Sequence, residues 1–259
     1  MSWIEITELV LLGIFVGFVN TLSGSGSLLT LPFLISLGLP ANVANGTNRI
    51  AILFQNIVGV TSFKRQKVFE FKEAVWLTVP AVIGAIIGAS VAVKIDDNVM
   101  EKIIAVILVV MFFLLIFKPK MWMKEQSKEL KTKPDFIQFV IFFAIGVYGG
   151  FIQAGVGLFL ITGLVLGAGF DLVKANAIKL FIILFFTIFA LAIFIYNDNV
   201  NFKYGLILAA GNMLGAFTAS KFAVSWGPKF VRYVLLSALF LASLELFGVF
   251  NYIFGYFNG

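Results

Sequence analysis

The sequence contains no cysteine and no histidine among its 259 residues. This excludes disulfides, thiolate and imidazole metal ligands, and catalysis by a cysteine or histidine side chain. Charged residues are also scarce, at 12% of the chain, whereas soluble domains carry about 25%. Hydrophobic residues make up 61% instead. This composition predicts an all-α polytopic protein that passes several times through the cell (inner) membrane, with the lipid bilayer as its surroundings.

Charged and turn residues divide the chain into ten hydrophobic segments. The first five are 4–22, 27–38, 42–63, 73–94 and 99–117, and the second five are 135–153, 157–168, 173–196, 204–222 and 230–256. We therefore expect a first transmembrane repeat at 1–117, a basic cytoplasmic linker at 118–134, and a second repeat at 135–259. Segments 27–38 and 157–168 would be helices of about 18 Å, too short to span a bilayer alone. They either complete a crossing or re-enter the membrane.

The two halves of the chain resemble each other. Arg49 and Lys179 lie 130 positions apart, each near the start of the third segment of its half. Further pairs recur at 129 to 131 positions: Ala44-Asn45 with Ala175-Asn176, Phe71-Lys72 with Phe202-Lys203, Gly17 with Gly146, Gly26 with Gly155, Gly38 with Gly167, and Gly84 with Gly215. If all five segments of each half cross, the halves have opposite orientations. Such inverted-topology repeats are typical of secondary transporters.

Lysine and arginine are concentrated in the loops 64–72 and 118–134, and three basic residues (Lys221, Lys229 and Arg232) lie at or beside the loop 223–230. The loops 95–98 and 197–202 contain aspartate and neither basic residue. Basic loops normally face the cytoplasm. With ten crossings both termini lie outside; if segments two and seven re-enter, both lie inside. Because topology explains most of the net charge of +6, we expect no nucleic-acid partner.

Two glycine-rich stretches interrupt the hydrophobic segments, and we expect each to break a helix. The first is "SGSGS" at 23–27, and the second is "GGFIQAGVGLF" at 149–159. Irregular backbone at membrane depth must be buried or line a cavity, and the free N–H groups that open a helix attract anions. The hydroxyls of Ser23, Ser25 and Ser27 and the amide of Gln153 would add donors. Other glycines at four-residue spacing predict close helix packing: Gly13, Gly17, Gly84, Gly88, Gly211 and Gly215.

Two cations lie within hydrophobic segments, Arg49 in "ANGTNRIA" and Lys179 in "ANAIKLF". A charge inside a membrane normally faces a cavity or a partner, although a long side chain can instead extend to the surface. We expect both to bind an anionic substrate, with polar neighbours as further ligands: Asn45, Thr47, Asn48 and Asn176. Glu245, in the last segment, would carry a coupling proton or pair with a basic residue, and we favour pairing.

These motifs resemble the sulfite exporter TauE/SafE family over most of the chain. The resemblance rests on a glycine-rich break, a proline, a Leu-Gly-x-Pro turn and an Ala-x-Gly-Thr helix start. Here these are Gly24 and Gly26, Pro32, Leu37-Gly38-Leu39-Pro40, and Ala44-Asn45-Gly46-Thr47. Serines interrupt the usual glycine run, and the second half lacks a counterpart of Pro32. The resemblance implies movement of sulfite, sulfonates or related organosulfur anions, commonly outward across the inner membrane.

The sequence thus predicts a secondary transporter for a small anionic substrate. An anion channel of the same architecture is the alternative. We do not expect an enzyme, because neither a metal-ligand cluster nor a nucleophile with its base is visible, and we expect no cofactor. The substrate, the coupling ion and a homo-oligomeric state stay open.

Overall fold

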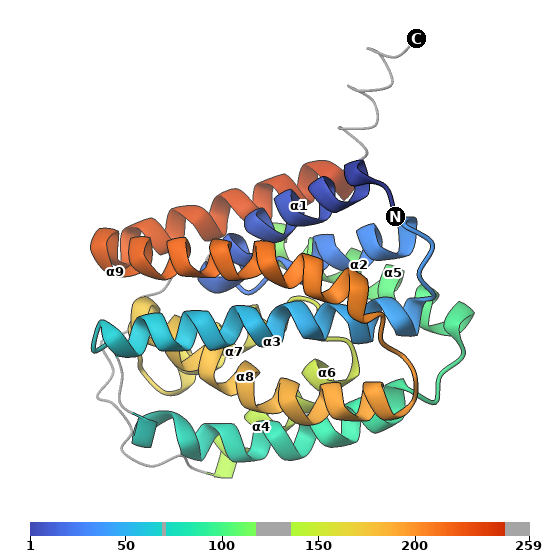
Figure 1. Ribbon diagram of the computed structural model, residues 1–259. Helices are drawn as coiled ribbons and strands as arrows, with labels where there is room; N and C mark the ends of the chain where they lie inside the picture. Colours follow the sequence, from blue (N-terminus) through green and yellow to red (C-terminus); the bar gives the residue numbers. More distant parts are fainter. Residues whose placement is uncertain (69–70, 118–135, 247–259) are drawn as a thin grey trace.

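The computed structural model describes the backbone of residues 1–68, 71–117 and 136–246, and the side chains over these ranges except 71–73, 112–117 and 227–246. All the regular elements in these ranges are helices (Figure 1). They are α1 (Trp3–Leu22), α2 (Ser27–Ser36), α3 (Ala41–Arg65), α4 (Phe71–Ala92), α5 (Asp97–Phe117), α6 (Phe136–Phe151), α7 (Val156–Thr162), η2 (Gly163–Gly167, a π-helical turn), α8 (Leu172–Tyr196) and α9 (Phe202–Leu246). The predicted linker 118–134 lies outside the described residues.

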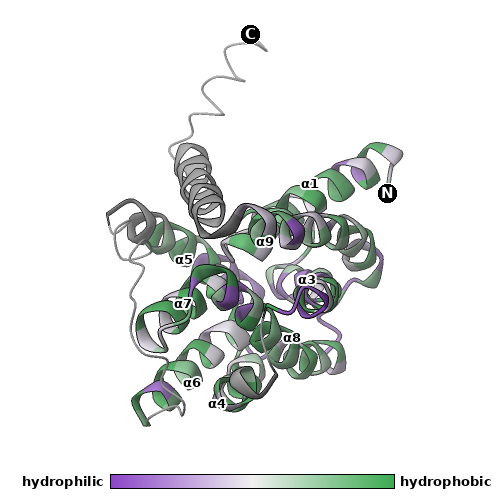
Figure 2. Cartoon of the chain, turned by 90° about the vertical axis from the view of Figure 1, so that its left-hand side faces the viewer, coloured by the Kyte–Doolittle hydropathy of each residue, from purple (hydrophilic) through white to green (hydrophobic). Residues whose placement is uncertain are grey.

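Four helices in the described part are long and apolar enough to cross a membrane: Trp3–Leu22, Ala74–Ala92, Leu172–Tyr196 and Phe202–Trp226. The all-helical, multi-pass membrane fold that the composition predicts is therefore confirmed. Figure 1 shows the long helices lying side by side along one common direction. Hydrophilic residues gather on and around α3, whereas the peripheral helices α4 and α6 are mostly apolar (Figure 2). Many polar side chains of α3 are buried, among them Asn45, Asn48, Arg49, Gln55 and Asn56.

The first two helices form a hairpin. At the turn, a Cβ built on Gly26 would lie 2.6 Å from the carbonyl oxygen of Val16, so the start of α2 lies beside the last turns of α1. Away from the turn, Leu34 and Leu39 belong to the same hydrophobic cluster as Leu9 of α1. Segment 27–38 therefore runs back along α1, and the glycine-rich stretch lies at the tip of the hairpin.

The second half contains a corresponding hairpin, made by α6 with α7 and η2. The side chain of Gln138, near the start of α6, donates to the carbonyl of Gly167 at 3.0 Å. Gly163 faces Phe142 of α6: a Cβ added at Gly163 would lie 3.4 Å from the Phe142 ring. Segment 157–168 therefore also turns back along the helix that precedes it. Both predicted breaks exist, and each sits at a hairpin tip.

Glycines bring helices of opposite halves into backbone contact. A Cβ on Gly17 of α1 would lie 2.3 Å from the carbonyl oxygen of Asn212 in α9, and one on Gly84 of α4 would lie 2.2 Å from that of Phe143 in α6. The four-residue spacing predicted this packing, and the contacts confirm it. The first helix of each half thus packs on a helix of the other half. A repeat with exchanged partners would have this arrangement, but the inverted orientation of the halves stays a prediction.

One predicted boundary is right in its position but wrong in its structure. We expected a loop at 223–230 between two segments, whereas the residues there are helical and α9 runs from Phe202 to Leu246. In Figure 1 the ribbon of α9 turns back on itself between its orange and red parts, so the chain does reverse direction between the two predicted segments. Pro228 lies within this helix, and a proline within a helix removes one hydrogen bond and can bend the helix without ending it. Straight, 45 residues would measure about 68 Å, so α9 cannot cross a bilayer of about 30 Å as one straight rod. The side chain of Glu245 lies outside the described residues.

Candidate functional site

The first hairpin tip is held together by its own serines. Gly24 has φ +76°, a conformation that glycine adopts without strain. The hydroxyl of Ser23 donates to a carbonyl one turn earlier in α1 at 2.8 Å, and the hydroxyl oxygens of Ser23 and Ser25 lie 2.7 Å apart. Ser27 accepts a long hydrogen bond from the amide of Asn20, at 3.5 Å. All three serines are buried, and in this conformation their hydroxyls serve the turn itself.

The second tip touches the first. Gln153 and Gly155 both have positive φ, at 57° and 69°, which turns the chain sharply between α6 and α7. A Cβ on Gly157 would lie 2.3 Å from the Cα of Gly24, and a Cβ on Gly24 would lie 2.3 Å from the Cα of Gly157. The side chain of Gln153 donates to the hydroxyl of Thr187 in α8 at 2.8 Å. The two broken segments therefore meet backbone to backbone.

Arg49 is fully buried and binds the end of α6. Its guanidinium donates to the carbonyls of Gly149 at 3.2 Å and Gly150 at 2.6 Å. It also donates to the side-chain oxygens of Gln153 and Asn45, both at 3.3 Å. The carbonyls that end a helix carry partial negative charge, which a cation stabilises. Arg49, in the first half, thus caps the broken helix of the second half.

Lys179 makes the reciprocal contact. Its ammonium, also fully buried, donates to the carbonyls of Asn20 at 3.0 Å and Thr21 at 2.8 Å, at the end of α1. A third bond, 2.7 Å long, goes to the side-chain oxygen of Asn176. A lysine of the second half therefore caps the broken helix of the first half. Neither side chain reaches the surface, so the alternative in which the long side chains of Arg49 and Lys179 extend out of the membrane is wrong.

No carboxylate compensates these charges among the described side chains. The only salt bridge found there joins the amino terminus of Met1 to Glu5, at 3.8 Å and on the surface. An uncompensated charge in a low-dielectric interior is unfavourable, and helix-end dipoles offset it only in part. The described side chains around Arg49 and Lys179 therefore include no acidic group that would neutralise these two basic residues. Groups of acidic residues that could hold a metal ion are absent from the same part of the chain.

Several buried polar atoms of the cations, of residues on the same helices and of a residue that binds Lys179 have no hydrogen-bond partner among the described residues. They include Nε of Arg49 itself, the amide nitrogen of Asn176, and the hydroxyl of Thr21, whose carbonyl binds Lys179. The side chains of Asn48 and Asn56 on α3 are also unpartnered at both amide atoms. Unsatisfied buried polar groups are rare in proteins and each one is unfavourable. Most of these atoms are donors, which is what an anion requires.

The other predicted ligands divide between the site and its scaffold. Asn45 lies in the site, where its amide nitrogen also donates to the carbonyl of Phe151 at 2.8 Å. The hydroxyl of Thr47 accepts from the backbone N–H of Asn201 at 2.8 Å, just before α9. Asn48 is buried on α3, next to Arg49 in sequence. The bonds of Asn45 and Thr47 therefore tie the start of α3 to α6 and to the start of α9.

The sequence prediction missed a cluster of amides beside the first tip. The side-chain oxygen of Gln55 accepts from Asn20 at 3.3 Å and from Asn212 at 3.1 Å, which ties α1, α3 and α9 together. Asn20 also accepts from the backbone N–H of Gly26 within the break, at 3.2 Å. All three amide side chains are buried. Their signal was present as lone polar residues inside hydrophobic segments, but the sequence prediction named polar residues only beside the two cations and within the glycine-rich stretches.

The comparison with known proteins agrees with this architecture. The profile of the family described as "Sulfite exporter TauE/SafE" matches residues 9–246. The chain belongs to this family. The "Probable membrane transporter protein ORF9" of Sinorhizobium is 26% identical over 89% of this chain and 87% of its own length. The "Probable membrane transporter protein YfcA" of Escherichia coli K12 is 26% identical over 88% and 85%. A "Probable membrane transporter protein" of Haemophilus influenzae is 22% identical over 90% and 91%.

No solved structure matches the chain. The names of the family and of these relatives indicate a multi-pass membrane transporter of the TauE/SafE family and point away from an enzyme. Within that family, the sequence motif at the first break corresponds to the tip that carries Gly24, and the Ala-x-Gly-Thr start corresponds to the first turns of α3. Two of the four motifs that carry the resemblance therefore lie beside residues that contact the cations: Asn45 binds Arg49, and Thr21, just before the first break, binds Lys179.

Proposed function

We propose that this protein is a secondary transporter that exports small sulfur-containing anions, such as sulfite or a sulfonate, across the inner membrane. The observation that carries the proposal is the pair of buried cations, Arg49 and Lys179, at two helix breaks that touch each other. An oxyanion supplies the negative charge that the described side chains lack there. It also offers several oxygen atoms to N–H and O–H donors, and such charge-assisted hydrogen bonds are strong.

The hydrogen bonds of the two cations support a mechanism for the transport cycle. All three N–H groups of Lys179 are directed to protein oxygens in this conformation, two of them at the end of α1. An anion that binds Lys179 would take over some of these donors and release the end of α1. The same exchange at Arg49 would release the end of α6. Because each cation belongs to the half opposite its helix, anion binding would alter contacts between the halves, as alternating access needs.

The inverted relation of the halves is part of the proposal. It is supported by the exchange of partners between halves, α1 with α9 and α4 with α6, through glycines that correspond in the two halves. It is supported further by the loops: α3 ends and α4 begins at one end of the molecule, whereas the two aspartate-bearing connections lie at the other (Figure 1). The basic end would face the cytoplasm. The anion-channel alternative gains no support, because the tips pack tightly and both cations are buried.

Counterflow into proteoliposomes tests the proposal. Vesicles preloaded with unlabelled sulfite should accumulate labelled sulfite transiently, with saturable rates, and a sulfonate should compete. A neutral thiol of similar size should not compete, because it brings no negative charge to the site. Uptake that does not saturate and shows no counterflow would indicate a channel. Equal competition by the neutral thiol would contradict the anion site.

A further inference from the structure

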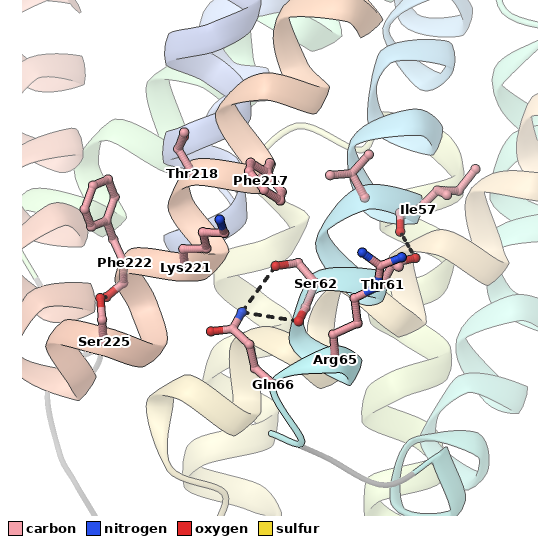
Figure 3. A pocket seen from close by; sticks show the side chains of 11 residues that line it. Ile57, Thr61, Ser62, Arg65, Gln66, Phe217, Thr218, Lys221, Phe222 and Ser225 are labelled. Atoms are coloured by element: carbon pink, nitrogen blue, oxygen red, sulfur yellow. Dashed lines mark hydrogen bonds between the residues drawn. The ribbon is translucent and has the colours of Figure 1, made fainter.

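A second basic site lies away from the buried cations, in a groove between α3 and α9. The groove has a volume of about 1010 Å³ and is lined by Ile57, Val58, Thr61, Ser62, Arg65, Gln66, Phe217, Thr218, Lys221, Phe222 and Ser225 (Figure 3). Beside the groove the hydroxyl of Ser220 donates to that of Ser62 at 2.6 Å. The side-chain amide of Gln66 donates to the carbonyl and the hydroxyl of Ser62, both at 3.2 Å, and to the carbonyl of Ser220 at 3.4 Å. These bonds connect α3 and α9 next to the groove.

The side chains that line the groove change along the two helices from apolar to basic. Part of its lining is apolar and faces outward: Ile57 and Phe217 are each 43% exposed. Arg65 lies two helical turns beyond Ile57, and Lys221 lies one turn beyond Phe217 and places its ammonium 4.3 Å from the centroid of that ring. None of the lining residues is acidic. One end of the groove thus offers two positive charges, and the rest offers surface suited to hydrocarbon.

The end with the cations lies where membrane and water meet. Trp226, one turn beyond Phe222, is 60% exposed, and tryptophan is enriched at membrane interfaces. The neighbouring loop 64–72 contains four basic residues and is predicted to face the cytoplasm. The cytoplasmic leaflet contains anionic lipids, and basic pockets between transmembrane helices bind their headgroups. The two positive charges, the position at the membrane interface and the apolar lining all suit the same ligand, an anionic lipid.

We propose that this groove binds one anionic phospholipid of the cytoplasmic leaflet. Arg65 and Lys221 bind its phosphate, with hydroxyl and amide donors from Ser225 and Gln66 beside them. An acyl chain lies along Ile57 and Phe217. The lipid would bridge α3 to α9, two helices whose contact also passes beside the Gln55 and Asn212 amides. This binding site is independent of the buried cations, so its failure would leave the proposed transport activity standing.

Lipid binding to the purified protein in detergent tests the proposal. We expect native mass spectrometry to show retained phosphatidylglycerol in preference to phosphatidylethanolamine. The double variant Arg65→Gln/Lys221→Gln should lose this preference, with phosphatidylglycerol affinity falling about tenfold or more. The matched variant Lys94→Gln/Lys203→Gln, which removes the same charge from exposed positions outside the groove, should keep it. Equal loss in both variants would contradict the site.

Three further measurements test whether a lipid or another ligand occupies the groove. Thr218→Trp fills the groove and keeps every charge, so it should weaken phosphatidylglycerol binding as well; unchanged binding would overturn the proposal. Glycerol 3-phosphate, which has the headgroup charge and no acyl chain, should not displace the lipid at equal concentration, and displacement would identify a soluble-anion site instead. A stable dimer that cross-links through Thr218→Cys without added lipid would show that a second copy of the chain occupies the groove, which would also overturn it.

Discussion

Replacing Arg49 by alanine should destabilise the protein and weaken substrate binding, and the two effects can be separated. The guanidinium makes four hydrogen bonds, of which the one to Gly150 is the shortest at 2.6 Å. Removing it leaves two helix-end carbonyls and two side-chain oxygens without this donor in the interior. Leaving a buried polar atom unpaired is unfavourable by about 1–3 kcal/mol, and relaxation recovers part of this. We therefore expect a loss of roughly 3–5 kcal/mol, similar to breaking a buried charge pair.

Arg49→Lys should recover part of this loss. An ammonium keeps the charge but lacks the planar fork that reaches both Gly149 and Gly150, so a deficit of about 2 kcal/mol should remain. Thermal melting of the purified variants in detergent measures the order, which should be wild type, then lysine, then alanine. Equal melting of wild type and alanine variant would refute the capping role of Arg49.

Substrate affinity supplies the second test of the same residue. If Arg49 binds an oxyanion, the charge-assisted hydrogen bond that is lost contributes about 2–3 kcal/mol, so the apparent substrate constant should rise about 30- to 150-fold in Arg49→Ala. Ser25→Ala should have a smaller effect, about 1 kcal/mol for one neutral hydrogen bond. Initial rates of sulfite counterflow, normalised to folded protein in the vesicles, give these constants. Wild-type affinity in a correctly inserted alanine variant would contradict the anion-site assignment.

Three other predictions follow from single contacts. Gly157→Ala should prevent normal folding, because its Cβ would lie 2.3 Å from the backbone of the opposite tip. Gly167→Ala, whose Cβ would have nothing within 4 Å, should express and melt like wild type. Equal behaviour of the two variants would show that the tips do not touch. Ser62→Cys/Ser220→Cys should form a disulfide with mild oxidant, because the native hydroxyls are 2.6 Å apart and the chain has no other cysteine; a missing cross-link on denaturing gels would contradict the contact of α3 with α9. Asn98→Cys, in a connection predicted to lie outside, should react in intact cells with an impermeant thiol reagent; protection until the cells are opened would reverse the orientation.

Local sequence patterns were sufficient to locate the helices and their breaks. The run "SGSGS" predicted the interruption before α2, because alternating glycines at membrane depth need buried, irregular backbone. Glycines at four-residue spacing predicted the close packing of α1 and α4 on other helices, which the contacts of Gly17 and Gly84 confirm. These features depend on residues within a few positions of one another. The predicted segment boundaries therefore agree with the observed helices to within a few residues, apart from the continuous α9.

The contacts of the charged residues could not be predicted in the same way. The sequence indicated that Arg49 and Lys179 lie inside the fold, but their partners are backbone carbonyls 100 and 159 positions away along the chain. A backbone carbonyl has no sequence signature, so nothing distinguished capping of the opposite half from exposure to a cavity. The contact of Thr47 could not be predicted for a related reason: its bond to the N–H of Asn201 depends on where α9 starts in space.

The central claim, that the buried cations bind an anionic substrate, is tested most directly by calorimetric titration of the purified protein with sulfite. Wild type should bind in a saturable way, and so should Lys179→Arg, which keeps the positive charge although with altered geometry. Lys179→Met, close in length and without charge, should lose about 30-fold or more in affinity, since a charge-assisted hydrogen bond contributes about 2–3 kcal/mol. If Lys179→Met stays helical and monodisperse and binds sulfite as tightly as wild type, the buried cations are structural caps and the anion site lies elsewhere.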